Sequence, residues 1–170
     1  MSEPQPETLL FDPDPASGFP NSSLPVLIYR QMIDSTGDAA APAFEAMFAD
    51  HRWPPEWRYG LFDFDHFHST AHEALGVFRG HAHIRLGGPN GSEHDIAAGD
   101  VLVLPAGVGH ANLASSDDFS MVGAYPPGQR WEVERGDPDH FAAACRRVAA
   151  VAMPVDDPVG GPLRSLWRKA

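Results

Sequence analysis

Short apolar runs separated by turn residues dominate the middle of the chain and predict strands rather than helices. Such runs fall at residues 24–30, 101–104 and 119–124. Residues 74–78 lack polar–apolar alternation, which is typical of a strand buried on both faces. The sequence Gly-Gly-Pro-Asn-Gly at 87–91 predicts a hairpin turn, because glycine and asparagine tolerate positive φ. Several short strands at regular spacing favour an antiparallel sandwich or barrel.

Two segments outside these strands show helical patterns. Apolar positions recur every three or four residues at Phe44, Met47 and Phe48, and Asp38 is suited to cap the start of that helix. A second helix is predicted over residues 137–151, where Asp-Pro-Asp forms a typical first turn. The sequence therefore predicts a β-rich domain with short flanking helices.

Composition along the chain divides it into three parts. Residues 1–23 are rich in Pro, Asp, Ser and Glu and predict an extended N-terminal arm. Residues 24–152 carry the predicted strands and helices, and form one domain. Residues 153–170 contain several Pro and Gly residues and predict a tail without regular structure. Three apolar residues of this tail could dock on the barrel or on a partner subunit: Leu163, Leu166 and Trp167.

The charge of the chain excludes some classes of function. A formal net charge of −11 disfavours binding to nucleic acid or to an anionic membrane. The chain has no apolar run of 18 residues, and the acidic, Pro-rich residues 1–7 do not resemble a signal peptide. The single cysteine, Cys145, fits a reducing compartment, and we expect a cytoplasmic location. Three arginines could attract an anion, although surface roles are the simpler expectation: Arg58, Arg79 and Arg85.

Candidate chemistry lies in four residues that suit a divalent metal ion. His66 and His68 alternate along a predicted strand, so both can face one ion while Phe67 points away. Glu73 follows five residues later, and His110 ends the region after the apolar run at 101–104. Imidazole and carboxylate groups are common ligands of transition metals. Burying these polar groups in an apolar barrel would be costly without an ion.

His72 is an alternative ligand to Glu73. The two residues are neighbours, so on a strand they would point to opposite faces. If Glu73 is the ligand, His72 lies outside the site, and if the strand begins later, His72 can take its place. His81 and His83 repeat the His-x-His spacing but lack a carboxylate at the matching distance, so surface or structural roles are expected.

Aromatic residues near the predicted site have two interpretations. They could line the mouth of a pocket, although aromatic side chains more often fill the core of a small barrel: Trp57, Tyr59, Tyr125 and Trp131.

The pattern around the first histidine pair resembles that of the metal-binding cupins. Their first motif, G-x5-H-x-H-x3-4-E-x6-G, is matched at every fixed position by Gly60, His66, His68, Glu73 and Gly80.

The second cupin motif, G-x5-P-x-G-x2-H-x3-N, is matched except at its end. Ala114 occupies the place of the Asn, which is not a metal ligand, and the matching positions are Gly99, Pro105, Gly107 and His110. The residues of the first motif, and the sequence Gly-Ala-Tyr-Pro at 123–126, are similar to those of the uncharacterised YjlB-like bacterial cupins.

This resemblance implies an all-β fold, the cupin double-stranded β-helix or jelly-roll barrel. It implies a metal inside the barrel, held by His66, His68, Glu73 and His110. The ion would be a divalent transition metal: Fe, Mn, Ni, Zn, Co or Cu. The resemblance also implies a homodimer.

Two functions follow from this reading. The first is a metal-dependent enzyme that acts on a small organic molecule, for example as an iron-dependent dioxygenase, an isomerase or a decarboxylase. The second is a non-catalytic cupin that binds or senses a small molecule. Because cupins carry out many reactions, the resemblance specifies the site rather than the reaction.

Overall fold

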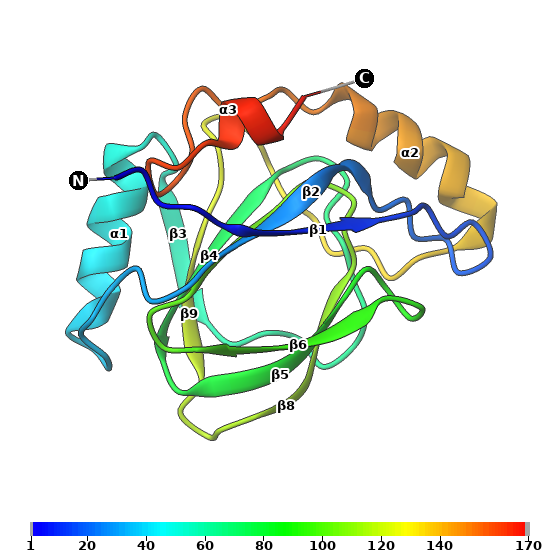
Figure 1. Ribbon diagram of the computed structural model, residues 1–170. Helices are drawn as coiled ribbons and strands as arrows, with labels where there is room; N and C mark the ends of the chain where they lie inside the picture. The colour runs from blue at the N-terminus through cyan, green and yellow to red at the C-terminus, as the bar shows by residue number, and fades with distance from the viewer. Residues whose placement is uncertain (1, 169–170) are drawn as a thin grey trace.

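Strands form most of the regular secondary structure of the described residues, and the larger of two antiparallel sheets contains six of them (Figure 1). The computed structural model describes residues 2–168. The order across this sheet is β1-β2-β7-β4-β9-β3. Its strands are β1 (Glu7–Phe11), β2 (Ser22–Tyr29), β3 (Pro55–Tyr59), β4 (Glu73–Arg79), β7 (Val101–Leu104) and β9 (Ser120–Ala124).

The smaller sheet has the order β6-β5-β8 and lies across the barrel interior from β1 and β2 (Figure 1). Its strands are β5 (His81–Leu86), β6 (Ser92–Ala97) and β8 (His110–Ser115). The predicted turn at 87–91 joins β5 to β6. Gly87 and Gly88 adopt φ of 96° and 87° there, which only glycine accommodates without strain.

Apolar side chains from both sheets fill the space between them. The larger sheet contributes Ile28, Leu75 and Leu102, and the smaller one contributes Ile84 and Ile96, all of which are buried. The predicted all-β jelly-roll fold with short flanking helices is therefore confirmed.

The helix α1 (Ala40–Asp50) covers the outer face of the larger sheet. Its Phe44 and Phe48 are fully buried in a second apolar cluster outside the barrel. Phe44 lies against β4 so closely that a Cβ at Gly76 would come within 2.5 Å of its ring. Strand β4 is thus packed on both faces, as its lack of alternation predicts.

The prediction that Asp38 caps α1 is wrong. The helix begins after Ala39, and no side chain caps its first turn. Asp38 instead pairs with Arg79 at 2.7 Å. The Asp38 carboxylate therefore forms a long-range ion pair with Arg79, although the local sequence predicts that it caps the helix.

The second helical region begins as its sequence predicts. Asp137 precedes the 3₁₀ turn η1 (Pro138–His140), and its carboxylate accepts a hydrogen bond from the backbone N–H of Asp139 at 2.9 Å. The helix α2 (Phe141–Ala150) follows directly.

The C-terminal tail contains regular structure, which corrects the sequence prediction. A short helix, α3 (Leu163–Leu166), forms after Pro162. Leu163 and Trp167 are buried in the apolar cluster that includes α1, and the Trp167 indole N–H donates to the Pro25 carbonyl at 2.8 Å. Leu166 is partly buried against the same cluster, so the tail packs on the barrel through all three apolar residues expected to do so.

The N-terminal segment contributes an edge strand to the larger sheet. Within residues 1–23, β1 pairs with β2 in antiparallel register, with Glu7 opposite Ile28. This strand lies beside β2 at the upper side of the barrel in Figure 1.

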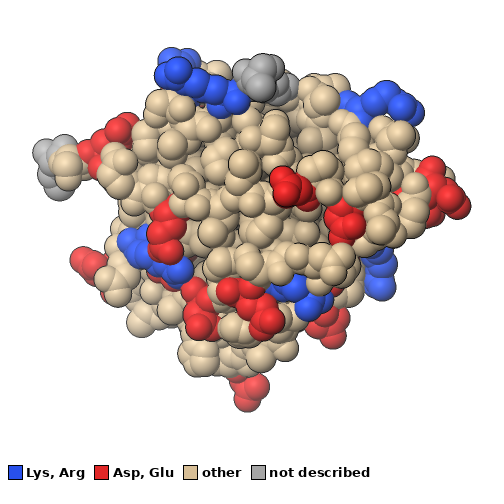
Figure 2. Space-filling model, turned by 45° about the vertical axis from the view of Figure 1, so that its right-hand side comes forward, with Lys and Arg blue, Asp and Glu red and all other residues tan. Residues whose placement is uncertain are grey.

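Acidic side chains are spread widely over the face shown in Figure 2, as a net charge of −11 leads one to expect. Within residues 2–168, no helix combines the length and apolar character needed to cross a membrane.

Candidate metal centre

The paired histidines lie in the connection between β3 and β4, which corrects the prediction that a regular strand carries them. His66 forms an isolated antiparallel bridge with His110, with backbone hydrogen bonds of 3.1 and 2.9 Å. The alternation still holds locally. Phe67 packs edge-on against Phe19, whereas the rings of His66 and His68 lie 5.7 Å apart on the other side.

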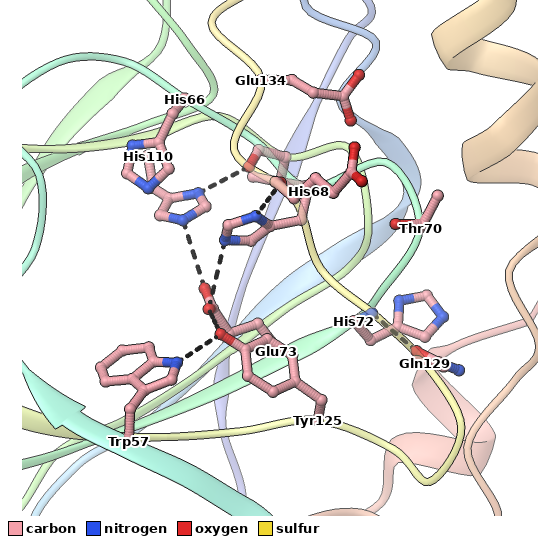
Figure 3. A network of polar contacts seen from close by, with 12 residues as sticks. Trp57, His66, His68, Thr70, His72, Glu73, His110, Tyr125, Gln129 and Glu134 are labelled. Atoms are coloured by element: carbon pink, nitrogen blue, oxygen red, sulfur yellow. Dashed lines mark hydrogen bonds and ion pairs between the residues drawn. The ribbon is translucent and has the colours of Figure 1, made fainter.

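The other two candidate ligands come from different sheets. Glu73 is the first residue of β4 and His110 is the first residue of β8. Figure 3 shows both side chains pointing toward His68, with His66 beside His110. All four residues are buried, with exposed fractions between 2% and 6%.

Three imidazoles form a compact group. One nitrogen from each of His66, His68 and His110 lies within 4.8 Å of the others, which is close enough to hold one ion. Glu73 reaches two of them, because its carboxylate oxygens lie 3.4 Å from Nε2 of His68 and 3.4 Å from Nε2 of His110. The structure thus brings all four predicted residues together.

Backbone carbonyls fix the orientation of each imidazole. Nδ1 of His66 lies 2.9 Å from the Phe64 oxygen, Nδ1 of His68 lies 2.7 Å from the Glu132 oxygen, and Nδ1 of His110 lies 2.9 Å from the Val108 oxygen. A carbonyl only accepts, so each Nδ1 carries the proton. Each Nε2 is then left with a lone pair, and this arrangement is typical of metal-binding histidines.

The residues present fit a divalent transition metal. Nε2 of His110 is buried and makes no hydrogen bond, a costly arrangement that a bound cation would relieve. Three imidazoles and one carboxylate are also a donor set that such ions favour.

Burial sets the protonation of His66. Removal from water lowers the pKa of His66 to about 3, and repulsion from His110 acts in the same direction. The imidazole is therefore neutral at pH 7, as a metal ligand must be.

The electrostatics of His68 and Glu73 are coupled. Burial disfavours the charged forms of both groups, but their mutual attraction and hydrogen bonding outweigh it. The pKa of His68 is raised, and the pKa of Glu73 is held well below its ordinary value, with further electrostatic attraction from His110. Glu73 is therefore an anion at the centre of the site.

Tyr125 contributes a contact that the sequence analysis missed. Its hydroxyl donates to Glu73 Oε2 at 2.5 Å and accepts from the Trp57 indole N–H at 2.8 Å (Figure 3). Burial and the charge of Glu73 raise the pKa of Tyr125, so its proton stays in place. The sequence signals for Tyr125 are its position directly after β9 and its place within residues 123–126, which resemble the YjlB-like cupins, but neither predicts a contact with Glu73.

His72 lies apart from the cluster, on the other side of the chain from Glu73 (Figure 3). Its backbone N–H donates to the Gln129 side chain at 2.9 Å, and its Nδ1 accepts from the Ala106 N–H at 2.9 Å. Its ring packs 4.8 Å from that of Trp167. The structure therefore places His72 between the barrel and the C-terminal tail.

A cavity of about 290 Å³ leads from the surface to the cluster. The four aromatic residues that could line a pocket mouth all line this cavity: Trp57, Tyr59, Tyr125 and Trp131. Tyr59 and Trp131 are 64% and 36% exposed, so they lie toward the opening, whereas the buried histidines lie at its inner end.

The three arginines considered for anion binding are each paired with a carboxylate. The partners are Glu45 for Arg58, Asp38 for Arg79 and Asp65 for Arg85. Only Arg58 is among the lining residues of the cavity.

A small antiparallel barrel that encloses a cluster of histidines defines the class of this protein. Comparison with known proteins agrees with that class. Residues 65–126 match the cupin family. The uncharacterised protein YjlB of Bacillus subtilis strain 168 is 35% identical over 162 residues, which cover 94% of this chain and 95% of the relative.

Solved structures give weaker likenesses. A DUF861 family protein from Thermotoga maritima is 18% identical, with a TM-score of 0.35, over 58% of this chain and 96% of that one. A cupin 2 domain-containing protein from Halorhodospira halophila is 14% identical, with a TM-score of 0.33, over 89% of this chain and 85% of that one.

This chain belongs to the cupin family, as the two sequence motifs imply.

Proposed function

We propose that the protein is a metal-dependent enzyme that acts on a small organic molecule inside the barrel. His66, His68, Glu73 and His110 would hold the ion. The observation that carries this proposal is the orientation of the imidazoles, each with Nδ1 bonded to a backbone carbonyl. Protein stability alone gives no reason to gather three buried ring nitrogens within 4.8 Å of one another.

The cavity supports a catalytic rather than a purely structural role for the ion. Structural metal sites are closed, whereas catalytic sites keep a position open for water or substrate. Here a cavity of about 290 Å³ adjoins the cluster, so a small molecule could reach it. A divalent transition metal bound there supplies a Lewis acid, or a redox centre in the case of iron.

The surrounding residues would keep the site ordered. Tyr125 donates a hydrogen bond to Glu73 and so helps to hold the carboxylate as an anion in a fixed position. Trp57 in turn donates to the Tyr125 hydroxyl and fixes that group. The barrel walls exclude bulk water, which strengthens electrostatic interactions within the site.

A screen for turnover tests this function. Protein loaded with Fe²⁺, Mn²⁺ or Zn²⁺ is incubated with a panel of small organic molecules, with and without O₂, and products are detected by mass spectrometry. We expect turnover that is absent from the His68→Ala/His110→Ala variant. Metal-loaded protein that binds members of the panel but converts none of them would instead support a non-catalytic binding cupin.

We further propose that the protein acts as a homodimer in the reducing cytoplasm. The dimer rests on the resemblance to other cupins, and the reducing compartment on the single cysteine, Cys145. Size-exclusion chromatography with light scattering tests the first proposal, and a monomer at micromolar concentration would contradict it.

A further inference from the structure

We propose that the cavity takes an uncharged, largely apolar molecule of about one aromatic ring, with a single polar head directed at the metal. This inference rests on the proposed function, because the head requires an ion at the inner end. It goes further by naming the chemical class of the ligand. Three independent features of the cavity support it: the character of its walls, the state of its charges and its size.

The walls of the cavity are mainly apolar. Leu61, Phe62 and Leu75 line it together with Trp57 and Trp131. Because Leu75 is buried near Glu73 whereas Phe62 is 39% exposed, apolar surface extends from the inner end to the opening. A ligand that fills this space gains stability by burying apolar surface.

Aromatic rings form one side of the cavity near the ligand cluster. Trp131 stacks on Tyr125, with ring centroids 5.8 Å apart and an angle of 19° between planes. The same indole meets His68 edge-on at 5.6 Å. A flat ring placed beside Trp131 would therefore lie close to the metal ligands, in a geometry that aromatic pairs favour.

The charged residues at the cavity are already neutralised. Among the described residues that line it, only Arg58 and Glu73 carry a full charge apart from the histidines. Two of the three guanidinium nitrogens of Arg58, Nε and Nη2, donate to the Glu45 carboxylate on α1, at 3.0 and 2.6 Å, so this charge is paired outside the cavity. Arg135 lies outside the lining, with its guanidinium 3.6 Å from the centre of the Phe64 ring.

An anionic substituent would therefore lose its hydration without gaining a cation, apart from the metal. Such a loss is unfavourable in an apolar site. The net charge of −11 opposes anions further, because it makes the potential around the whole protein negative. These two effects exclude substrates that carry a carboxylate or phosphate group in addition to the polar head.

The volume of the cavity fits a ligand of this size. A cavity of about 150 Å³ is known to hold benzene. The cavity here, about 290 Å³, is therefore large enough for one ring and a short polar arm.

Three hydroxamates with the same metal-binding head test the inference. Benzohydroxamate carries an aromatic ring, acetohydroxamate carries only a methyl group, and succinic monohydroxamate carries a carboxylate. Each is titrated by calorimetry into protein loaded with Zn²⁺, whose occupancy is measured beforehand by elemental mass spectrometry. We expect benzohydroxamate to bind at least about tenfold more tightly than acetohydroxamate, because its ring buries more apolar surface. We expect succinic monohydroxamate to bind more weakly than both.

Variants at Trp131 test whether the preference for benzohydroxamate arises from contacts within the cavity. This side chain is 36% exposed, so its replacement should not prevent folding. Trp131→Ala should reduce the advantage of benzohydroxamate over acetohydroxamate to less than about threefold, since the stacking surface is lost. Trp131→Phe should restore much of it, and Zn²⁺ occupancy should be unchanged in both variants.

The outcomes separate this inference from the proposed function. Equal binding of the three hydroxamates, a preference for the carboxylate, or no binding to zinc-loaded protein would each overturn the apolar ligand class and leave the metal centre standing. A protein that takes up no zinc would overturn both.

Discussion

The chain contains two His-x-His pairs with identical spacing and opposite surroundings. His66 and His68 are buried at the inner end of the cavity. His81 and His83 lie on β5, and their side chains face away from the barrel. The contrast shows that spacing places two imidazoles on one side of the chain, whereas topology decides whether that side can hold a metal ion.

The first pair is prepared to bind a metal. Each Nδ1 is bonded to a backbone carbonyl, so each Nε2 faces the interior, where Glu73 and His110 arrive from different sheets. Burial lowers the pKa of His66, which keeps its ring neutral.

The second pair, His81 and His83, lacks this orientation by backbone carbonyls. The side chain of His83 is 40% exposed, and its two ring nitrogens contact Asp95 and Glu93, each at 2.7 Å. Hydrogen bonds to Asp95 and then to Glu93 raise the pKa of His83 and occupy both ring nitrogens, which leaves neither of them free for a metal ion.

Removing one imidazole from each pair gives the largest expected difference. His68→Ala should reduce bound metal to less than about one tenth of the wild-type level in micromolar Co²⁺, because the remaining ligands hold the ion weakly. The matched variant His83→Ala should bind as the wild type does. Competition with a chelator of known affinity measures both, and equal losses would contradict the contrast between the pairs.

Replacing neighbouring residues sharpens the ligand assignment. Glu73→Gln should weaken metal binding by about 100-fold, since a neutral amide replaces the anion at the centre of the cluster. His72→Ala should leave the metal affinity nearly unchanged but lower the free energy of unfolding by about 1–3 kcal/mol, because the buried Ala106 N–H loses its acceptor. Metal titration and urea denaturation measure the two effects. The reverse order of metal affinities would assign the ligand role to His72.

A smaller effect is expected from the hydroxyl group that contacts Glu73. Tyr125→Phe removes the hydrogen bond to the carboxylate and leaves the ring in place. Loss of a partner of a metal ligand typically weakens metal binding by about 10-fold or somewhat more. Thermal unfolding of the metal-free variant serves as the control for stability. Unchanged affinity for Co²⁺ would show that Tyr125 does not position Glu73.

The smallest effect concerns the pH response of the exposed pair. The folded-state pKa of His83 is raised, so its contribution to stability is fully present below pH 6.5 and is lost as the pH rises through the folded-state value. NMR titration of the ring should give a pKa above 6.5 that falls in Asp95→Asn. A value at or below 6.5 in the wild type would contradict the ion pairs seen here.

The sequence predicts much of the fold because the relevant signals are local. Turn residues at 87–91 and the apolar run at 101–104 define strands by themselves. Three predictions fail, and they involve distant partners or short or irregular segments. His66 and His68 lie in a connection and not on a regular strand. Asp38 binds Arg79 instead of capping α1, and α3 forms in a tail whose Pro and Gly content hides it.

The candidate site shows the same contrast between residues that a local pattern identifies and residues that depend on distant parts of the chain. The cupin motifs identify the four residues that converge, because their spacing follows from the barrel. The groups that orient them are separated too widely for a local pattern. Tyr125 lies 52 residues from Glu73, and the carbonyl that accepts from His68 belongs to Glu132, 64 residues away.

Metal content of the purified protein tests the central claim most directly. The protein is prepared without a histidine tag or chelator and analysed by elemental mass spectrometry, beside the double variants His66→Ala/His110→Ala and His81→Ala/His83→Ala. We predict near-stoichiometric Fe, Mn, Ni, Co, Cu or Zn in the wild type and in the second variant, and almost none in the first. Absence of metal from the wild type, even after reconstitution, or equal content in all three proteins would contradict the assignment of the site.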